Sequence, residues 1–278
     1  MVDRIGLDCI CVFGMAPVEY VELAAKLGCT DIGMSAKPVV GLPEFYPQWT
    51  LRDNPALVRD VKAAVAHHGI GIAVAEGFFV LPNGDVSAFA ADLDLLADVG
   101  AKRATICVFE TDRTRAFDQL GAFAELAAAR GMGSQVEFVP SLAIGDFATA
   151  LDAINYIGRK DFGMVVDSMH LFRCGATAAD VATLAPEAIG HIQICDVPWK
   201  VAPEGHGMEA GSERLCPGEG ELPLAELIAV LPEGRVIGLE VPMKKRTLAG
   251  ESAESRLRPC VEATRALLAE ARSAATAG

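Results

Sequence analysis

Residues 133–167, GSQVEFVPSLAIGDFATALDAINYIGRKDFGMVVD, contain a complete strand–helix–strand unit. The stretches 133–139 and 162–167 are short and apolar, as expected of buried strands. Residues 146–157 between them are rich in alanine, leucine and isoleucine at helical spacing. An alternation of strand and helix is typical of an α/β fold.

The same alternation runs along the whole chain. Strands are predicted at residues 5–10, 30–34, 70–75, 103–108, 133–139, 162–167, 191–195 and 236–241. Helices are predicted at residues 17–27, 55–68, 86–99, 116–129, 146–157, 178–184, 224–231 and 253–274. Eight units without a linker-like stretch predict one (β/α)8 TIM-barrel domain over residues 1–278. A doubly wound sheet is the alternative, but CICVFG at residues 9–14 is not the Gly-rich phosphate loop that it would be expected to carry.

Composition excludes several classes of partner. The chain has 37 acidic and 24 basic residues and a net charge of −13, which disfavours a nucleic-acid partner. It has no apolar run of the roughly 18 residues needed to span a membrane. The first residues, MVDRI, do not resemble a signal peptide, so we expect a cytoplasmic protein. The eight cysteines form no Cys-x-x-Cys pair, and free thiols are expected.

Four polar residues stand in strongly apolar strands. Glu137, Asp167, Gln193 and Glu240 lie at or near the ends of the last four predicted strands. A buried carboxylate in a strand costs several kcal/mol unless it is paired or bound to a metal. Any one of these residues alone fits an ordinary polar layer of a barrel interior equally well. Together they converge on one point at the mouth of the barrel, as a divalent cation site requires.

Several motifs from Glu137 onward resemble one known family, the divalent-metal sugar isomerases and epimerases with the xylose-isomerase-like barrel. The motifs are the strand Glu137, the Asp-x-x-His of Asp167 and His170, the His-x-Gln-x-x-Asp at residues 191–196, PGEGEL at residues 217–222 and Glu240. The resemblance implies one divalent metal ion held by Glu137, Asp167, Gln193 and Glu240.

Gln193 departs from the common pattern, since many members of that family have histidine at this position. Glutamine there is similar to the 3-dehydroshikimate dehydratase branch. A glutamine oxygen makes the set of ligands all-oxygen, which suits Mn²⁺ or Mg²⁺ better than Zn²⁺. We therefore expect Mn²⁺ or Mg²⁺, with Co²⁺ and Zn²⁺ as alternatives.

Other residues are expected near this mouth. His170 follows Asp167 by three residues, in a predicted loop, and its family counterpart contacts substrate. Glu76, at the end of the third predicted strand, lines the pocket or forms a loop salt bridge. Arg214 matches an arginine that the family uses on substrate. Together with the basic run of residues 244–246, Arg214 predicts an anionic substrate, although an exposed arginine and solvated loop charges explain these residues as well.

The resemblance and the acidic cluster predict an enzyme that removes a proton next to a carbonyl. Glu137 or Glu240 would take the proton to give an enediolate, and His170 would donate a proton or orient the hydroxyl. The expected activity is isomerisation or epimerisation of a sugar-like or polyol-derived hydroxyketone.

The alternatives are a lyase of the 3-dehydroshikimate or inosose dehydratase type, acting through the same enediolate, and a non-catalytic metal- or ligand-binding barrel. A nuclease related to endonuclease IV would need many histidine ligands, and this chain has five histidines. A small-molecule substrate is expected, and a homo-oligomer is compatible with the sequence.

Overall fold

A computed structural model of the protein describes residues 4–202 and 204–277. Its strands are all parallel and pair in chain order, and the last pairs with the first. They are β1 (Ile5–Leu7), β2 (Asp31–Ser35), β3 (Gly71–Val80), β4 (Arg103–Val108), β5 (Gly133–Glu137), β6 (Phe162–Asp167), β7 (Ile189–Ile194) and β8 (Ile237–Leu239). The closed barrel confirms the predicted (β/α)8 TIM barrel and excludes the doubly wound sheet.

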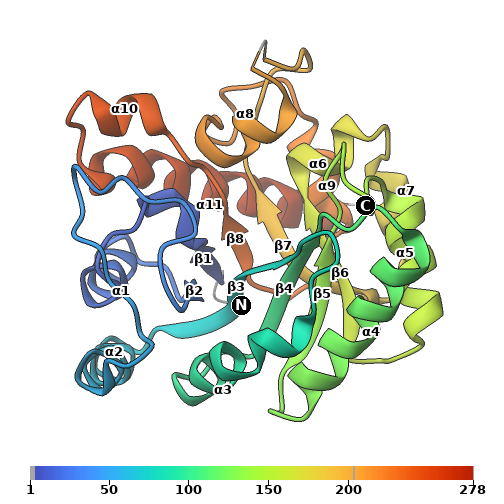
Figure 1. The fold of residues 1–278 in the computed structure, drawn as a ribbon. Coiled ribbons are helices and arrows are strands. Elements are labelled where there is room, and N and C mark those ends of the chain that lie inside the picture. Colours follow the sequence, from blue (N-terminus) through green and yellow to red (C-terminus); the bar gives the residue numbers. More distant parts are fainter. Residues whose placement is uncertain (1–3, 203, 278) are drawn as a thin grey trace.

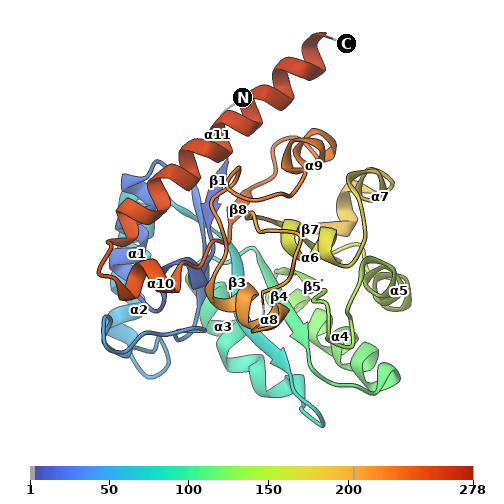
Figure 2. The same cartoon turned by 90° about the horizontal axis from the view of Figure 1, so that it is seen from above.

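Helices surround the strands in the view from above (Figure 2). They are α1 (Pro17–Lys26), α2 (Pro55–His68), α3 (Ala90–Asp98), α4 (Arg113–Ala128), α5 (Phe147–Ile157), α6 (Ser168–Arg173), α7 (Ala178–Ala182), α8 (His206–Ser212), α9 (Leu224–Val230), α10 (Lys244–Leu248) and α11 (Ala253–Ala277). In Figure 1, α8 stands above the strands. No helix in the described part of the chain combines the length and the apolar character needed to cross a bilayer.

The strands are apolar because both of their faces are covered. Every residue of β2, β6 and β7 is buried, as expected when a parallel sheet has helices outside and a filled interior. The polar members of these strands, such as Asp167 and Gln193, are therefore buried with the rest. All eight cysteines are free thiols.

The structure corrects two local predictions. His170 does not lie in a loop: α6 begins directly after Asp167, whose carboxylate caps the helix by accepting the His170 N–H. Strand β3 runs on to Val80 because it pairs with β4 as far as Val108, beyond a register shift after Ala75. Glu76 therefore lies within β3 and not at its end.

The long connection after β7, residues 197–223, is anchored at its base by Asp196. This buried carboxylate accepts hydrogen bonds from the backbone N–H groups of Val197, Gly218 and Leu222. The connection returns to the barrel because both ends bind one side chain. Its middle carries α8 and Arg214.

Replacement of Asp196 by alanine should release this connection. Three backbone donors lose their acceptor, and the free energy of unfolding should fall by about 3 kcal/mol. Asp196→Asn, which keeps one acceptor oxygen, should lose less. Urea denaturation of both variants measures the effect, and a loss under about 1 kcal/mol for the alanine variant would contradict this anchoring role.

Candidate functional site

The strands bring the predicted polar residues to one end of the barrel. Glu137 ends β5, Asp167 ends β6, and Glu240 directly follows β8. Gln193 of β7 lies opposite Asp167 on one side and Gly238 on the other. Since adjacent strands lie about 4.8 Å apart, these four side chains share the carboxyl-end mouth of the barrel.

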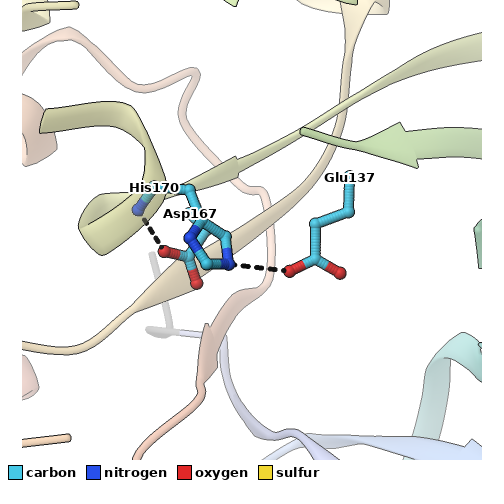
Figure 3. Close-up of side chains that lie close together, drawn as sticks. All are labelled: Glu137, Asp167 and His170. Atoms are coloured by element: carbon cyan, nitrogen blue, oxygen red, sulfur yellow. Dashed lines mark hydrogen bonds and ion pairs between the residues drawn. The ribbon is translucent and has the colours of Figure 1, made fainter. Parts of the chain in front are cut away.

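One group at this mouth consists of Glu137, Asp167 and His170 (Figure 3). The His170 N–H donates to Asp167 Oδ1 at 2.9 Å, and His170 Nε2 lies 3.4 Å from Glu137 Oε1. One potential ligand atom from each residue lies within 4.8 Å of the others. These three residues could therefore contact one ion or one small molecule.

Arg214 lies buried between two of the carboxylates. Its Nη1 is 2.5 Å from Asp167 Oδ2, and its Nη2 is 2.6 Å from Glu240 Oε2. Its Nε donates to the carbonyl of Ala210, in α8. The exposed loop arginine considered from the sequence is therefore excluded. The prediction that Arg214 binds an anionic substrate stays a prediction, since its guanidinium already neutralises protein carboxylates.

Burial and charge act differently on the two carboxylates that share Arg214. Burial tends to raise the pKa of Asp167, but the charges of Arg214 and His170 lower it to about 2. Burial raises the pKa of Glu240 well above its usual value; Arg214 opposes this rise, and Glu137 and Asp167 add to it. Asp167 is thus the permanent anion beside Arg214, and Glu240 is the carboxyl that more readily accepts a proton.

One polar atom of the Gln193 side chain has a hydrogen-bond partner, and the other has none among the described residues. Its Nε2 donates to Glu240 Oε1 at 2.9 Å. Its Oε1 is buried and has no hydrogen-bond partner among the described residues. Such an orphan acceptor is costly, and a cation would satisfy it. Oxygen donors of this kind suit a hard divalent cation. Glu137 and Asp167 lie in one potential metal-binding group with His170, and Glu240 lies in another with Asp8 and Glu76, so the predicted set of four ligands stays a prediction.

A second acidic group adjoins the first. One oxygen each from Asp8, Glu76 and Glu240 come within 4.8 Å of one another, and His191 Nε2 lies 3.3 Å from Asp8 Oδ1. Gly238 leaves room for this group, because a Cβ there would lie 2.9 Å from Asp8 oxygens and from His191 Nε2. Burial and then the charge of Asp8 raise the pKa of Glu76 to about 8.

His206, in α8, contacts His170 across the mouth. His206 Nε2 lies 2.8 Å from His170 Nδ1. Burial and then the charge of His170 lower the pKa of His206 to about 4, so it is neutral at pH 7. A neutral His206 that donates from Nε2 leaves the Nε2–H of His170 directed at Glu137. Close contacts thus join these three side chains in a row.

A cavity of about 300 Å³ opens over these groups. Its polar lining includes Glu137, Glu240, His170, Arg214 and Glu76. Its walls are mainly apolar and come from several elements, among them Ile10, Val39, Val40, Phe79, Phe109, Val139 and Leu142. The two long connections, residues 35–54 and 197–223, both contribute to the lining. The cavity thus has reactive groups at its base and apolar surface above them.

Sequence reasoning left three residues of this region unassigned: Asp8, Cys107 and His206. Asp8 follows β1 as Glu240 follows β8, so its position in the chain was a usable signal. Cys107 Sγ lies 3.3 Å from Glu137 Oε2, a contact that the apolar strand gave no reason to expect. In the basic run, Lys244–Leu248 forms α10, and Arg246 pairs with Glu251 at 2.6 Å.

The barrel resembles proteins of known structure. The model of the family described as "Xylose isomerase-like TIM barrel" matches residues 21–260. The IolI protein with a bound zinc atom is 17% identical, with a TM-score of 0.78 over 96% of this chain and 98% of that one. L-ribulose 3-epimerase is 16% identical, with a TM-score of 0.73 over 99% and 97%. D-psicose 3-epimerase from Clostridium cellulolyticum H10 is 14% identical, with a TM-score of 0.71 over 95% and 99%. No curated protein matches the sequence significantly.

The raised pKa of Glu76 predicts a pH-dependent stability. The folded pKa of about 8 lies above the unfolded value near 4.3, so the folded protein holds a proton that the unfolded chain has released. This contribution is complete at low pH and is lost as pH rises from about 4.5 to 8. Glu76→Gln should therefore gain stability relative to wild type by roughly 2–4 kcal/mol across that window.

Urea midpoints measured from pH 5 to pH 9 test this expectation. The exposed residue Glu226 of α9 gives a matched control, because Glu226→Gln should parallel the wild type at every pH. Parallel curves for Glu76→Gln and wild type would show that Glu76 has no raised pKa.

Proposed function

The chain belongs to the xylose isomerase-like TIM barrel family, and we propose that it is a sugar isomerase or epimerase that moves a proton at the carbon next to a carbonyl. The observation that carries this proposal is that two carboxyl groups, Glu137 and Glu240, line the same cavity from different strands. Two such groups can remove a proton from one side of a carbon and return one to another side or to the neighbouring carbon. The epimerases among the structural neighbours support this assignment.

Glu137, Asp167, Gln193 and Glu240 would hold a divalent cation, Mn²⁺ or Mg²⁺ by the all-oxygen set of donors. The neighbouring structure with a bound zinc atom is consistent with a metal in this family of barrels. When bound, such a cation polarises the substrate carbonyl and makes the adjacent C–H more acidic.

The protein's own residues then divide the remaining tasks. Glu240, whose carboxyl lines the cavity, would accept the proton from the substrate in its ionised form, which Arg214 stabilises. Glu137, whose Oε1 lies 3.4 Å from His170 Nε2, is suited to return one. Arg214 keeps Asp167 ionised and fixes Glu240, so that the reacting carboxyls stay in place.

Dehydration is a second candidate, and the contact of His170 with His206 favours it. Loss of a β-hydroxyl requires a proton donor near the leaving oxygen, and His170, which lines the cavity and has His206 at its Nδ1, is placed for this role. Gln193 adds to this candidate, because glutamine at its position resembles the dehydratase branch of the family.

Exchange of substrate hydrogen in D2O separates the proposals. With Mn²⁺ or Mg²⁺ added, wild type should incorporate deuterium next to the carbonyl of a ketohexose, an inosose or 3-dehydroshikimate, as followed by NMR. Rearranged product identifies an isomerase or epimerase, and loss of water identifies a dehydratase. Glu240→Gln should slow exchange by a factor of at least about 100, because a proton-transfer group contributes about 10²–10⁴-fold.

Glu226→Gln, which removes a carboxylate from the outer helix α9, should keep the wild-type rate of exchange. Circular dichroism checks that both variants are folded. Wild-type rates in Glu240→Gln would show that this carboxyl takes no part in proton transfer. Absence of exchange on every hydroxyketone, with metal bound, would favour a non-catalytic barrel.

Arg214→Met tests the cation site through stability alone. Removing the guanidinium leaves Asp167 and Glu240 buried without a counter-charge, which should lower the free energy of unfolding by about 3–5 kcal/mol in EDTA. Added Mn²⁺ should raise the melting temperature of this variant more than that of wild type, because the cation replaces the lost charge.

Arg173→Met is the matched control. Arg173 forms a buried ion pair with Glu209 at 2.5 Å, and neither residue is one of the proposed cation ligands. This variant should be destabilised similarly, and Mn²⁺ should not restore it beyond the wild-type response. Equal responses of the two variants to Mn²⁺ would argue against a cation site at Asp167 and Glu240.

A further inference from the structure

A second cavity lies at the opposite end of the barrel. It measures about 190 Å³ and is lined by residues at the amino ends of strands. Arg4 precedes β1, Asp31 begins β2, Arg103 begins β4, and Arg235 precedes β8. The groups proposed for catalysis lie at the carboxyl ends, so this cavity is separate from them.

Cations outnumber anions in this cavity although the protein as a whole is acidic. Its lining contains Arg4, Lys102, Arg103 and Arg235 against one carboxylate, Asp31. Asp31 pairs with Arg4 at 2.9 Å. Within the described residues, Lys102, Arg103 and Arg235 form no ion pair. The cavity lining therefore has three basic side chains without an ion pair among the described residues, within a chain of net charge −13.

The hydrogen bonds of Arg103 go to neutral groups, and the charge of Asp161 also acts on it. Its Nε donates to Gln135 Oε1 at 2.7 Å, and its Nη2 donates to the carbonyls of Ser134 at 2.8 Å and Asp161 at 3.2 Å. The carboxylate of Asp161 is taken by Arg159. Burial and then the charge of Arg235 lower the pKa of Arg103 to about 10. The guanidinium thus lies in a position that a counter-anion would stabilise.

The backbone leaves space for this guanidinium. A Cβ at Gly133 would lie 2.5 Å from Arg103 Nη1, and a Cβ at Gly190 would lie 3.1 Å from its Nη2. Gln135 fixes Arg103 from a third side and is itself bound to Thr105. Arg103 is therefore a fixed element of the cavity, unlike a flexible surface arginine.

We propose that this cavity binds a small phosphate-type oxyanion through Lys102, Arg103 and Arg235. A phosphate carries a charge of about −1.5 to −2 and has several acceptor oxygens. It can therefore accept hydrogen bonds at once from Lys102 and Arg103, at the start of β4, and from Arg235, before β8. A planar carboxylate is best bound by one arginine fork and would leave the other cations unpaired. The volume is below the roughly 300–1,000 Å³ typical of drug-sized ligands, so the occupant is small.

Thermal unfolding at constant ionic strength tests this proposal. Inorganic phosphate should raise the melting temperature of the wild-type protein saturably in EDTA, whereas chloride at the same ionic strength should not. The double variant Lys102→Gln/Arg235→Gln should weaken the apparent affinity at least tenfold. Both side chains can be neutralised without loss of an ion pair among the described residues.

Two controls make the result specific. Arg59→Gln removes an exposed cation of α2 that is remote from the cavity and should change the affinity less than twofold. Lys102→Gln alone, at an exposed position, gives a milder variant if the double variant unfolds. Glycerol phosphate in place of inorganic phosphate distinguishes the sources of the group: tighter binding of the ester indicates a phosphorylated metabolite, and weaker binding indicates free phosphate.

Three outcomes would overturn the proposal. They are no saturable response to either phosphate compound, equal affinity in wild type and the cavity variants, and binding of succinate without binding of phosphate. None of these measurements depends on the proposed isomerase activity or on added metal.

Discussion

The charge balance around Arg214 is the constraint on which the rest of this barrel mouth depends. Closing eight parallel strands places Asp167 and Glu240 at the same mouth, and neither carboxylate can be buried there without a counter-charge. Arg214 supplies it, with nitrogen–oxygen distances of 2.5 and 2.6 Å. The arginine comes from the connection after β7, so the connection and the barrel stabilise each other: Asp196 anchors its base and Arg214 joins its far part to the carboxylates.

The need to balance buried negative charge also applies to the group of Asp8, Glu76 and Glu240. Asp8 and Glu76 lie close to Glu240, and among the described residues His191 is the basic side chain paired with Asp8. Burial and then the charge of Asp8 raise the pKa of Glu76 to about 8. Burial tends to lower the pKa of His191, but the charge of Asp8 raises it. Protons rather than further cations therefore balance the negative charge here. A barrel interior with this content can store and transfer protons next to the cavity base.

The barrel fold and the polar residues at the strand ends could be predicted from the sequence, because both depend on the local pattern of apolar and polar residues. Asp167 and Gln193 each interrupt an apolar strand, and such a residue is visible without knowledge of its partners. His170 was assigned to a loop because its helix is short and is started by a side chain of the site, Asp167. The contact of His206 with His170 spans 36 residues and depends on how residues 197–223 fold back. A local sequence pattern cannot predict such a contact between distant residues. The pairing of Arg214 with two carboxylates was not predicted for the same reason.

The shape of the cavity adds a consequence for how a substrate would lie. Hydrogen-bonding and charged groups are concentrated at the base, among them Glu137, His170 and Glu240, whereas Val39, Phe79 and Phe109 face the upper part. A hydroxyl pressed against the apolar wall would lose its water without gaining a partner, at a cost of roughly 1–3 kcal/mol. The oxygen-rich end of a substrate is therefore directed to the base, and its carbon-rich end to the wall. For the reaction proposed above, this polarity favours one orientation of the substrate, with its oxygen-bearing end directed to Glu137 and Glu240.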